Sequence, residues 1–308
     1  MNISTDLEGL PLDDSPSVVS LGVFDGVHLG HRAILERNVA LARERGLRPT
    51  VVTFRDHPKR VILGRAPRTL TTLEHRLAHF RRLGVEHTLA LAFDEALRET
   101  PADRFITEIL VRSLNAAAFV LGFDSKFGRG RAGGPELLTS LGFPVEVVPK
   151  VVVDQRAVSS TAIREAVELG DLEGARSMLG RPISVFGRVV KGQQMGRKLG
   201  FPTANLDLAH ELHPPPGVYA CQATLILEEG EDEVRPAVAN IGFRPTVSGE
   251  ASGEPTIEVH LLDFEADLYG AAMELEFAAR IRDEQRFDGL EALRAQIARD
   301  VDEVRRLL

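Results

Sequence analysis

The stretch Phe24–His31, "FDGVHLGH", continues from the apolar run "SVVSLGVF" at residues 17–24. A short apolar run of this kind is typical of a buried strand. The residues from about Leu29 to Arg45 then carry a helical pattern, and Gly46 closes it, as glycines often close helices. The stretch is therefore expected at a turn between the end of a strand and the start of a helix.

Two glycines and two histidines give this turn its chemistry. Gly26 and Gly30 let the backbone approach a ligand closely. His31 falls in the first turn of the helix, where free N–H groups and the helix dipole favour an anion, and His28 lies three residues before it. The arrangement indicates a phosphate site with imidazole donors. Two metal ligands, or a glycine-rich turn with polar surface histidines, are the alternatives, although no nearby acidic or sulfur residue completes a zinc site.

Short apolar runs alternate with helical patterns from residue 17 to about residue 170. The alternation predicts an α/β domain with a mostly parallel sheet, helices on both faces and a ligand site beyond the carboxyl ends of the strands. Further strands are expected at residues 48–54, 86–93 and 117–123, and further helices at residues 71–84, 101–114, 159–170 and 171–180.

The pattern changes after Gly180-Arg181-Pro182. From Ile183 the chain shows short alternating or apolar runs separated by Gly and Pro, which is typical of an antiparallel barrel or sandwich. The tail carries a helical apolar stripe over residues 288–308, and Asp288 with Glu291 predicts a capping box at its start. We expect two domains, residues 1–181 and 182–308.

Composition is that of an ordinary soluble globular protein, with 44% hydrophobic and 27% charged residues among 308. The net charge of −8 repels nucleic-acid backbones and anionic lipid, and the absence of Trp with only two Tyr argues further against nucleic acid. The single cysteine, Cys221, excludes an intrachain disulfide and a multi-cysteine zinc site, and we expect it buried or half-buried. No signal peptide or membrane-spanning run is recognised, so a cytoplasmic protein is expected.

Several segments, in order along nearly the whole chain, resemble one family. "GVFDGVHLGH" (22–31) resembles the HxGH signature of the nucleotidylyltransferase superfamily, in the FDGxHxGH form of the bacterial bifunctional riboflavin kinase/FAD synthetases. "VVTFRDHPKR" (51–60), "LGFDSKFGRGRAGG" (121–134) and "VSSTAIREAVELGDLEGARSMLGRP" (158–182) are similar to later segments of that family. The chain departs from the family pattern at Arg55, Asp56, Ser125 and Lys126.

The resemblance implies adenylyl transfer in a Rossmann-like N-terminal domain, in which the phosphate of FMN attacks the α-phosphorus of ATP to give FAD and pyrophosphate. His28 and His31 would act as catalytic donors to the phosphoryl oxygens. The resemblance implies ATP binding here by Gly22, Phe24, Asp25, Gly26, His28, Gly30, His31, Ser159, Ser160, Thr161 and Arg164. It implies flavin binding by Asp124 and Phe127.

Three of these features have simpler interpretations. "SSTAIR" (159–164) places hydroxyls ahead of a helix, where they can bind a second phosphate or serve as an ordinary cap. Asp124 can equally be a loop acid. Gly128–Gly133, "GRGRAG", formally matches GxGxxG, but it comes late in the series and Pro135 follows it closely, so a mobile basic loop near the nucleotide is favoured over a dinucleotide fingerprint.

A second constellation lies at residues 187–208, "GRVVKGQQMGRKLGFPTANLDL". Its glycines, at 187, 192, 196 and 200, suit a loop folded over phosphates. Thr203 and Asn205 alternate on a short extended segment, so their side chains share a face and can share one hard cation. A Thr or Asx turn between strands is the alternative. Glu258 alternates with apolar neighbours, which alone indicates an outward-facing strand acid.

"GRKLGFPTANL" (196–206) resembles the riboflavin kinase motif, and "VANIGFRPTV" (238–247), "IEVHLLDF" (257–264) and "DLYG" (267–270) resemble later parts of that module. Met195 stands where many relatives carry arginine. The resemblance implies an antiparallel barrel with a closing helix, in which Glu258 is the catalytic base that takes the proton of the ribityl hydroxyl, and Thr203 and Asn205 hold Mg²⁺. It implies ATP binding by Gly192, Gly196, Lys198, Gly200, Thr203, Asn205 and Asn240, with Arg244 beside them, and flavin binding by Arg282 and Glu284.

The sequence thus predicts one chain with two consecutive steps, riboflavin to FMN and FMN to FAD, with Mg²⁺ and ATP serving both. The expected partners are small-molecule substrates, without nucleic acid or membrane, and the chain is expected to be a monomer or weak homo-oligomer. Two alternatives remain. Only one module is active, in which case the departures at Ser125 and Lys126 make the adenylyl step the expected loss, or the chain is a flavin-binding regulator without turnover.

Overall fold

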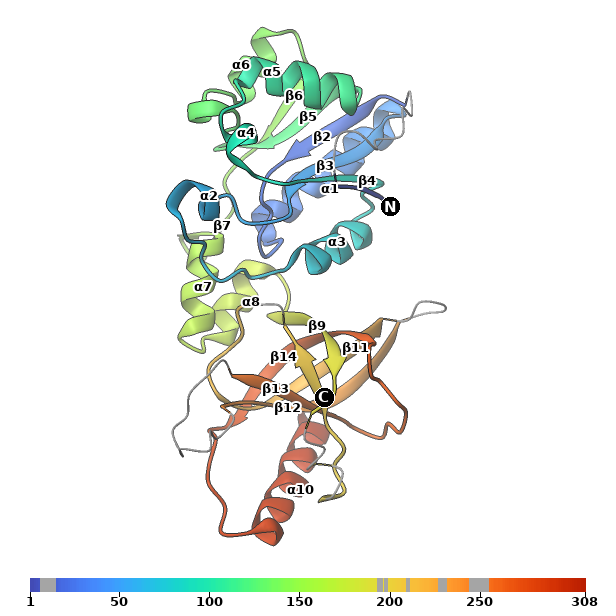
Figure 1. The fold of residues 1–308 in the computed structure, drawn as a ribbon, viewed down its shortest axis with the longest axis vertical. Coiled ribbons are helices and arrows are strands. Elements are labelled where there is room, and N and C mark those ends of the chain that lie inside the picture. The colour runs from blue at the N-terminus through green and yellow to red at the C-terminus, as the bar shows by residue number, and fades with distance from the viewer. Residues whose placement is uncertain (6–14, 193–195, 197–198, 209–210, 227–231, 244–254) are drawn as a thin grey trace. The chain divides into compact units, whose positions relative to one another are not determined.

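The structure is a computed structural model that describes residues 1–5, 15–192, 196, 199–208, 211–226, 232–243 and 255–308 (Figure 1). The chain divides into two units, Met1–Ser160 and Thr161–Leu308. The domain boundary expected between residues 181 and 182 stays a prediction. Lys198 and Arg244, two of the residues expected at the kinase site, and Met195 lie outside the described residues.

The first unit is built on a parallel sheet of six strands in the order β1-β4-β3-β2-β5-β6. The strands are β1 (Asn2–Ser4), β2 (Ser17–Leu21), β3 (Arg48–Phe54), β4 (His87–Leu91), β5 (Ala116–Gly122) and β6 (Val145–Val148), followed by a hairpin of β7 (Val152–Val153) and β8 (Arg156–Ala157). This confirms the predicted parallel α/β sheet. The edge strand β1 is absent from the sequence prediction because three residues carry no usable periodicity.

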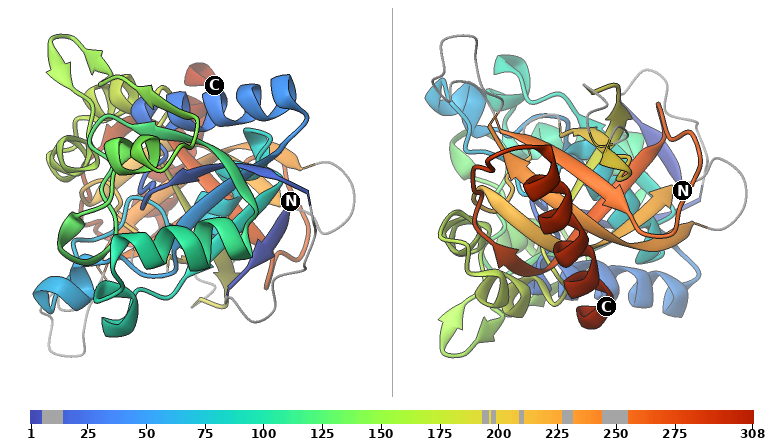
Figure 2. Two further views of the ribbon diagram at one scale, coloured as in Figure 1. Left: turned by 90° about the horizontal axis from the view of Figure 1, so that it is seen from above. Right: turned by 90° about the horizontal axis from the view of Figure 1, so that it is seen from below.

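Helices cover both faces of this sheet, as Figure 2 shows. They are α1 (Leu29–Arg45), α2 (Lys59–Leu63), α3 (Leu73–Arg82), α4 (Glu95–Arg98), α5 (Ala102–Arg104), η1 (Phe105–Ser113), α6 (Pro135–Ser140) and the short turn η2 (Arg129–Arg131). On β2, Val19 faces the cluster that contains η1 and α6, whereas Val18 packs against α1. Successive strand residues thus fill the cores of opposite faces, which explains the uninterrupted apolar runs.

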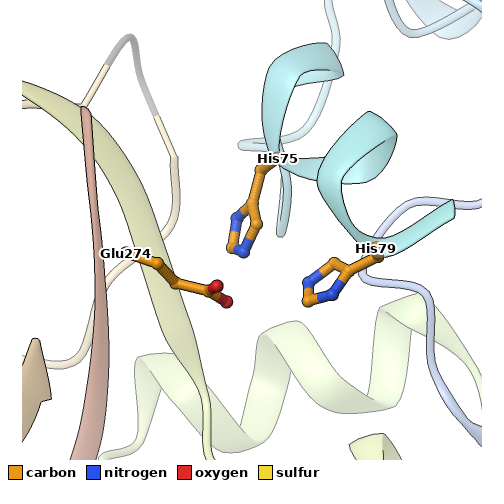
Figure 3. A group of neighbouring side chains, drawn as sticks. All are labelled: His75, His79 and Glu274. Atoms are coloured by element: carbon orange, nitrogen blue, oxygen red, sulfur yellow. The ribbon is translucent and has the colours of Figure 1, made fainter. Parts of the chain in front are cut away.

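Helix α1 begins and ends as its sequence predicts. His28 is its N-cap, and Gly46 follows it in the left-handed conformation with φ 64°. Helix α3 lies on the same face of the sheet, since Phe80 joins a core cluster with Leu35 and Val39 of α1. His75 and His79 lie one turn apart on the same helix and are both buried. Their ring centroids are 4.6 Å apart (Figure 3).

The second unit contains a closed barrel in the order β10-β13-β12-β11-β14-β9, in which every pairing is antiparallel. Its elements are α7 (Ser160–Glu168), which begins at the last residue of the first unit, α8 (Leu172–Leu179), β9 (Ser184–Val190), β10 (Ala204–Asp207), β11 (Gly217–Ile226), β12 (Glu233–Gly242), β13 (Thr256–Leu261), β14 (Ala272–Arg282) and α10 (Leu290–Leu307). Val301 and Val304 of α10 pack against Val218 and Val238 of the barrel. The predicted antiparallel barrel and its closing helix are confirmed.

The capping box predicted at Asp288 and Glu291 is wrong. Helix α10 begins at Leu290, so its N-cap is Gly289, with φ 120°, and no side chain caps it. A glycine has no side chain with which to accept the free N–H groups of the first turn. Cys221 lies fully buried on β11, as predicted.

None of the described helices combines the length and apolar character needed to cross a membrane.

Candidate active sites

The loop between β2 and α1 leaves the sheet through strained backbone. The predicted strand ends at Leu21 rather than Phe24, because Phe24 adopts φ 53° and Val27 φ 39°. Such left-handed values are unusual for bulky residues and persist where the surroundings fix them. Gly26 has φ 83°, and a Cβ there would lie 2.7 Å from Cδ1 of Leu70, so only glycine fits.

Asp25 anchors this loop from inside. Its side chain is 3% exposed, and its Oδ1 accepts hydrogen bonds from the backbone N–H groups of Leu70 and Thr71 at 2.9 and 3.0 Å and from the Thr71 hydroxyl at 3.3 Å. The backbone N–H of Gly26 in turn donates to Thr71 Oγ1 at 2.8 Å. Asp25 was predicted to bind ATP. In the structure its carboxylate binds Leu70 and Thr71 and so holds the loop in place.

The two histidines of the motif lie against each other. Their rings are stacked with centroids 3.6 Å apart and an interplanar angle of 15°. Nδ1 of His28 accepts the backbone N–H of His31 at 3.3 Å, which makes His28 the N-cap of α1. Phe24 packs edge-on against His31 at 5.2 Å, and Gly30 and Gly22 border the His28 and Phe24 rings. Five of the predicted residues therefore form one contiguous cluster at the start of α1.

His31 is held in its neutral form. Burial lowers its pKa well below 6.5, and the positive charges of His28 and Arg76 lower this pKa further. Within the described residues, Nδ1 of His31 is buried and has no hydrogen-bond partner. No third His, Cys, Asp or Glu ligand lies with the two histidines in the described part of the chain. The N–H groups at this helix N-terminus suit an anion, and the described residues supply no third ligand for a zinc site.

The "SSTAIR" segment starts α7. The hydroxyl of Ser160 donates to the backbone carbonyl of Asp25 at 2.9 Å, so this residue lies beside the histidine loop. Ser159 precedes the helix, and Thr161 and Arg164 lie in its first two turns, in the second unit. The structure thus gives Ser160 a positioning contact that spacing along the sequence did not reveal.

The loop after β5 carries the residues expected at the flavin. Asp124 is exposed, whereas Phe127 is 7% exposed and packs against Phe105 in the core. The N–H and carbonyl groups of Phe127 exchange hydrogen bonds with those of Gly133, which closes the "GRGRAG" turn. This glycine-rich turn lies between β5 and α6 rather than between a first strand and its helix, in agreement with the rejection of a dinucleotide fingerprint.

In the barrel, three predicted residues form one row across adjacent strands. Asn205 of β10 pairs directly with Glu258 of β13, and Glu258 pairs directly with Asn240 of β12. Directly opposed residues project to the same face of a sheet, so the three polar side chains are neighbours. Glu258 is half-buried in this row, where its sequence pattern alone indicated an outward-facing acid.

Two glycines of the second constellation lie against the side chains expected to bind magnesium. A Cβ on Gly192 would lie 2.1 Å from Nδ2 of Asn205, and one on Gly196 would lie 3.1 Å from Oγ1 of Thr203. Glu284, which follows β14, lies near Asn240, because both side chains border Gly242. A Cβ on Gly242 would lie 1.9 Å from Oε1 of Glu284 and 3.2 Å from Nδ2 of Asn240. Gly200 has φ 87°, and among the described residues no atom lies within 4 Å of a Cβ placed on it.

A cavity of about 610 Å³ opens beside Thr203. Its walls come from Thr203 and Ala204, from Val259 and Leu261, and from the loop Phe264–Tyr269. The Lys191 ammonium lies 5.6 Å from the centroid of the Tyr269 ring, at the beginning of the glycine-rich segment. The cavity was not part of the sequence prediction, although the segments 257–264 and 267–270, which resemble parts of the riboflavin kinase module, line much of it.

Arg282 is already engaged in an ion pair. Its Nε and Nη2 donate to the buried carboxylate of Asp300 on α10 at 3.0 and 2.8 Å, and Gln296 donates to the same carboxylate at 2.8 Å. The guanidinium also lies over the ring of Phe287, 5.7 Å from its centroid. The structure therefore gives this predicted flavin-binding residue a role in attaching α10 to the barrel.

Comparison with known proteins identifies the families that the two parts of the chain match. Residues 10–162 match the family model of FAD synthetase, and residues 179–308 match that of riboflavin kinase. The bifunctional riboflavin kinase/FMN adenylyltransferase of Escherichia coli K12 is 40% identical over 288 residues, which cover 92% of this chain and 90% of that protein. The chain belongs to the bifunctional riboflavin kinase/FMN adenylyltransferase family. This confirms the predicted bifunctional transferase and the order of its two modules.

Other members and one solved structure extend the similarity over almost the whole chain. The bifunctional riboflavin kinase/FMN adenylyltransferase of Bacillus subtilis is 38% identical over 300 residues, covering 94% of this chain and 92% of that protein. A crystal structure described as a macrolide-efflux protein from Streptococcus pneumoniae superposes with a TM-score of 0.81 at 31% identity, covering 98% of each chain.

Arg55, one of the departures from the family pattern, forms hydrogen bonds that stabilise the edge of the sheet. The guanidinium of Arg55 donates to the backbone carbonyl of Thr5, just after β1, and to that of Ala90 in β4 at 3.3 Å. Arg55 therefore ties the edge of the sheet to the end of β3. Lys126, another of these departures, forms an exposed ion pair with Glu136 at 3.4 Å.

Proposed function

We propose that this chain phosphorylates riboflavin to FMN with ATP in residues 182–308 and transfers the AMP group of a second ATP to FMN in residues 1–181, giving FAD and pyrophosphate. The observation that supports this most directly is that each family motif folds into its own contiguous constellation. One is the stacked histidine pair at the start of α1, and the other is the row of Asn205, Glu258 and Asn240 in the barrel.

In the adenylyl step, a phosphate oxygen of FMN attacks the α-phosphorus of ATP, and the bond to the bridging oxygen breaks to release pyrophosphate. His28 and His31 donate hydrogen bonds to the phosphoryl oxygens, on which negative charge accumulates. The N–H groups in the first turn of α1 add donors at the same place. Ser159, Ser160, Thr161 and Arg164 are proposed to bind a further phosphate, and Asp124 the flavin end.

In the kinase step, Glu258 accepts the proton of the ribityl 5′-hydroxyl while that oxygen attacks the γ-phosphorus of ATP and ADP leaves. Asn205 and Asn240 lie directly opposite Glu258 on the neighbouring strands. The adenosine end of ATP is proposed to lie in the cavity beside Thr203, with its phosphates towards Gly192 and Gly196.

Thr203 and Asn205 fit a magnesium ion because they offer hard oxygen ligands beside a glycine-rich segment that can bind phosphates. Mg²⁺, if bound there, would neutralise part of the charge of the ATP phosphates. The remaining parts of the proposal are a cytoplasmic location, a monomer or weak homo-oligomer, and no nucleic-acid partner. The net charge of −8 supports the last of these.

A time course with riboflavin, ATP and Mg²⁺ tests the proposal. Riboflavin, FMN and FAD are separated by chromatography. A rise of FMN followed by FAD is expected if both sites act. Accumulation of FMN alone leaves only the kinase active and directs attention to the loop at Ser125 and Lys126. Binding of flavin without any product contradicts both steps.

A further inference from the structure

Arg76 of α3 clamps the ends of two central strands. It is 4% exposed. Its Nη1 donates to the backbone carbonyl of Val23 at 2.6 Å and to the Thr53 hydroxyl at 2.9 Å, and its Nη2 donates to the backbone carbonyl of Phe54 at 2.9 Å. Thr53 Oγ1 donates to the same Val23 carbonyl at 3.1 Å. One planar guanidinium thus ties the chain just beyond β2 to the end of β3.

The Val23 carbonyl, which Arg76 binds, lies directly before the first strained residue of the loop between β2 and α1. Val23 directly precedes Phe24, whose φ of 53° turns the chain out of the strand direction. Charge-assisted hydrogen bonds to a carbonyl are roughly twice as strong as neutral ones, so Arg76 can hold this conformation against its cost. Two residues further on, Thr71 holds Asp25 and Gly26 through its hydroxyl. The segment Leu70–Arg76 therefore fixes both ends of the Val23–Gly26 backbone.

Arg76 also acts on His31 through its charge. The groups whose charge lowers the pKa of His31 are His28, on the same turn, and Arg76, on α3, in addition to burial. A fixed positive charge keeps the imidazole neutral while the site is empty and attracts a polyphosphate to it.

We propose that Arg76 and Thr71 are positioning residues for adenylyl transfer: they hold the Val23–Gly26 backbone in the strained form that presents His28 and His31 to the phosphates of ATP. The proposal rests on the adenylyl-transfer function proposed above. Neither residue belongs to the motif, and both lie at least 40 residues after it along the chain.

The test uses the full chain and two matched pairs of variants. Arg76→Met removes both the guanidinium hydrogen bonds and the positive charge. Arg76→Lys keeps the charge, but its ammonium group cannot bind the three acceptors that the planar guanidinium binds. Thr71→Val removes the hydroxyl at nearly constant volume, and Thr71→Ser restores it. For each variant, kcat and KM of FAD formation from FMN are measured, and FMN formation from riboflavin serves as the reference for folding. The pKa of His31 is followed by NMR of its ring C–H, assigned with His31→Gln.

We expect kcat for FAD formation to fall about 100-fold in Arg76→Met and about 10-fold in Thr71→Val, since misplacement by about 1 Å can cost a factor of this order. Thr71→Ser should recover most of the loss, and FMN formation should stay unchanged throughout. The pKa of His31 should rise in Arg76→Met and stay low in Arg76→Lys.

Other outcomes overturn the proposal. FAD formation within twofold of the unaltered chain in both Arg76→Met and Thr71→Val would show that neither residue positions the loop. A parallel fall of FMN and FAD formation would show that they only stabilise the chain. If the unaltered chain forms no FAD at all, the proposed adenylyl function itself fails, and this result is distinct from the other two.

Discussion

The imidazole of His28 performs two tasks at once, because it stacks on His31 at 3.6 Å and its Nδ1 accepts the backbone N–H of His31. A nitrogen that accepts carries no proton, so in the neutral ring the proton resides on Nε2. The backbone of α1 thereby selects the tautomer of the residue that precedes it. A phosphate oxygen at this helix end would meet an N–H donor whose orientation the helix already fixes.

Substitutions of His28 can distinguish its role as the N-cap of α1 from its proposed role as a donor to the phosphates. His28→Ala should lower FAD formation by about 100-fold, the usual cost of losing one preorganised donor. It should also destabilise the first unit by about 1 kcal/mol, since a helix cap is lost. His28→Asn is the matched control, because Asn restores the cap but not the imidazole. Chromatographic rates and thermal unfolding measure both effects.

FMN formation should remain intact in both His28 variants. Loss of FMN formation by a folded His28→Ala chain would contradict the assignment of separate sites. Recovery of FAD formation by His28→Asn would show that the cap alone, and not the imidazole, supports catalysis.

Stability of the first unit should fall as the pH decreases below about 6.5. Burial first, and then the charges of His28 and Arg76, lower the pKa of His31 in the folded chain, whereas the unfolded chain protonates near 6.5. Below that pH the unfolded state therefore binds more protons at this residue, and the free energy of unfolding decreases with falling pH, by at most about 1.4 kcal/mol per pH unit for one proton. The loss ends when the pH reaches the lowered pKa.

Urea unfolding between pH 7 and pH 5, followed by circular dichroism, measures this slope. His31→Gln should reduce it. The two tyrosines both lie in the second unit and the chain has no Trp, so tyrosine fluorescence reports the unfolding of that unit separately. An unchanged slope in His31→Gln would mean that other groups account for the acid sensitivity.

The sequence predicts most of the framework because the elements carry local signals. Continuous apolar runs mark the parallel strands, and Gly46 and Gly180, both left-handed in the structure, mark the ends of α1 and α8. The histidine motif is local as well. The contacts from Thr71 and Arg76 are not, since they reach the motif only through the fold and no spacing along the chain announces them.

Burial of single polar residues is harder to predict from a pattern. Glu258 alternates with apolar neighbours and so resembles a solvated strand acid, but the pairing of β13 with β10 and β12 places it between Asn205 and Asn240. Arg282 has the chemistry of a ligand-binding residue, but its partner Asp300 lies 18 residues away on a helix that packs only in the folded unit. In both cases tertiary pairing decides the environment.

Glu258→Gln should abolish FMN formation and spare FAD formation when FMN is supplied. Glutamine preserves the size of the side chain but cannot accept the hydroxyl proton, so the rate should fall by about 10²- to 10⁴-fold. Glu291→Gln, on the exposed face of α10, is the control for a lost charge in the same unit. Rates measured by chromatography with riboflavin or FMN as substrate distinguish the two steps. Riboflavin phosphorylation that survives Glu258→Gln would exclude this carboxylate as the base.

The ion pair between Arg282 and Asp300 should stabilise the second unit strongly. Asp300 is 3% exposed and accepts from both Arg282 and Gln296, so Asp300→Asn leaves the Arg282 side chain, which is 19% exposed, without its counter-charge. Loss of one partner of a fully buried pair costs about 3 kcal/mol or more, and for this partly exposed pair we expect about 1 to 3 kcal/mol. Asp302→Asn, on the exposed face of the same helix, should change the stability little.

Tyrosine fluorescence during urea unfolding measures this effect in the second unit, because Tyr219 and Tyr269 both belong to it. The midpoint should shift to lower urea in Asp300→Asn and stay in place in Asp302→Asn. Equal midpoints for the two variants would show that the ion pair contributes no net stability. If riboflavin phosphorylation nevertheless fell in Asp300→Asn, the pair would then act by orienting Arg282 towards the flavin, as the family resemblance implies.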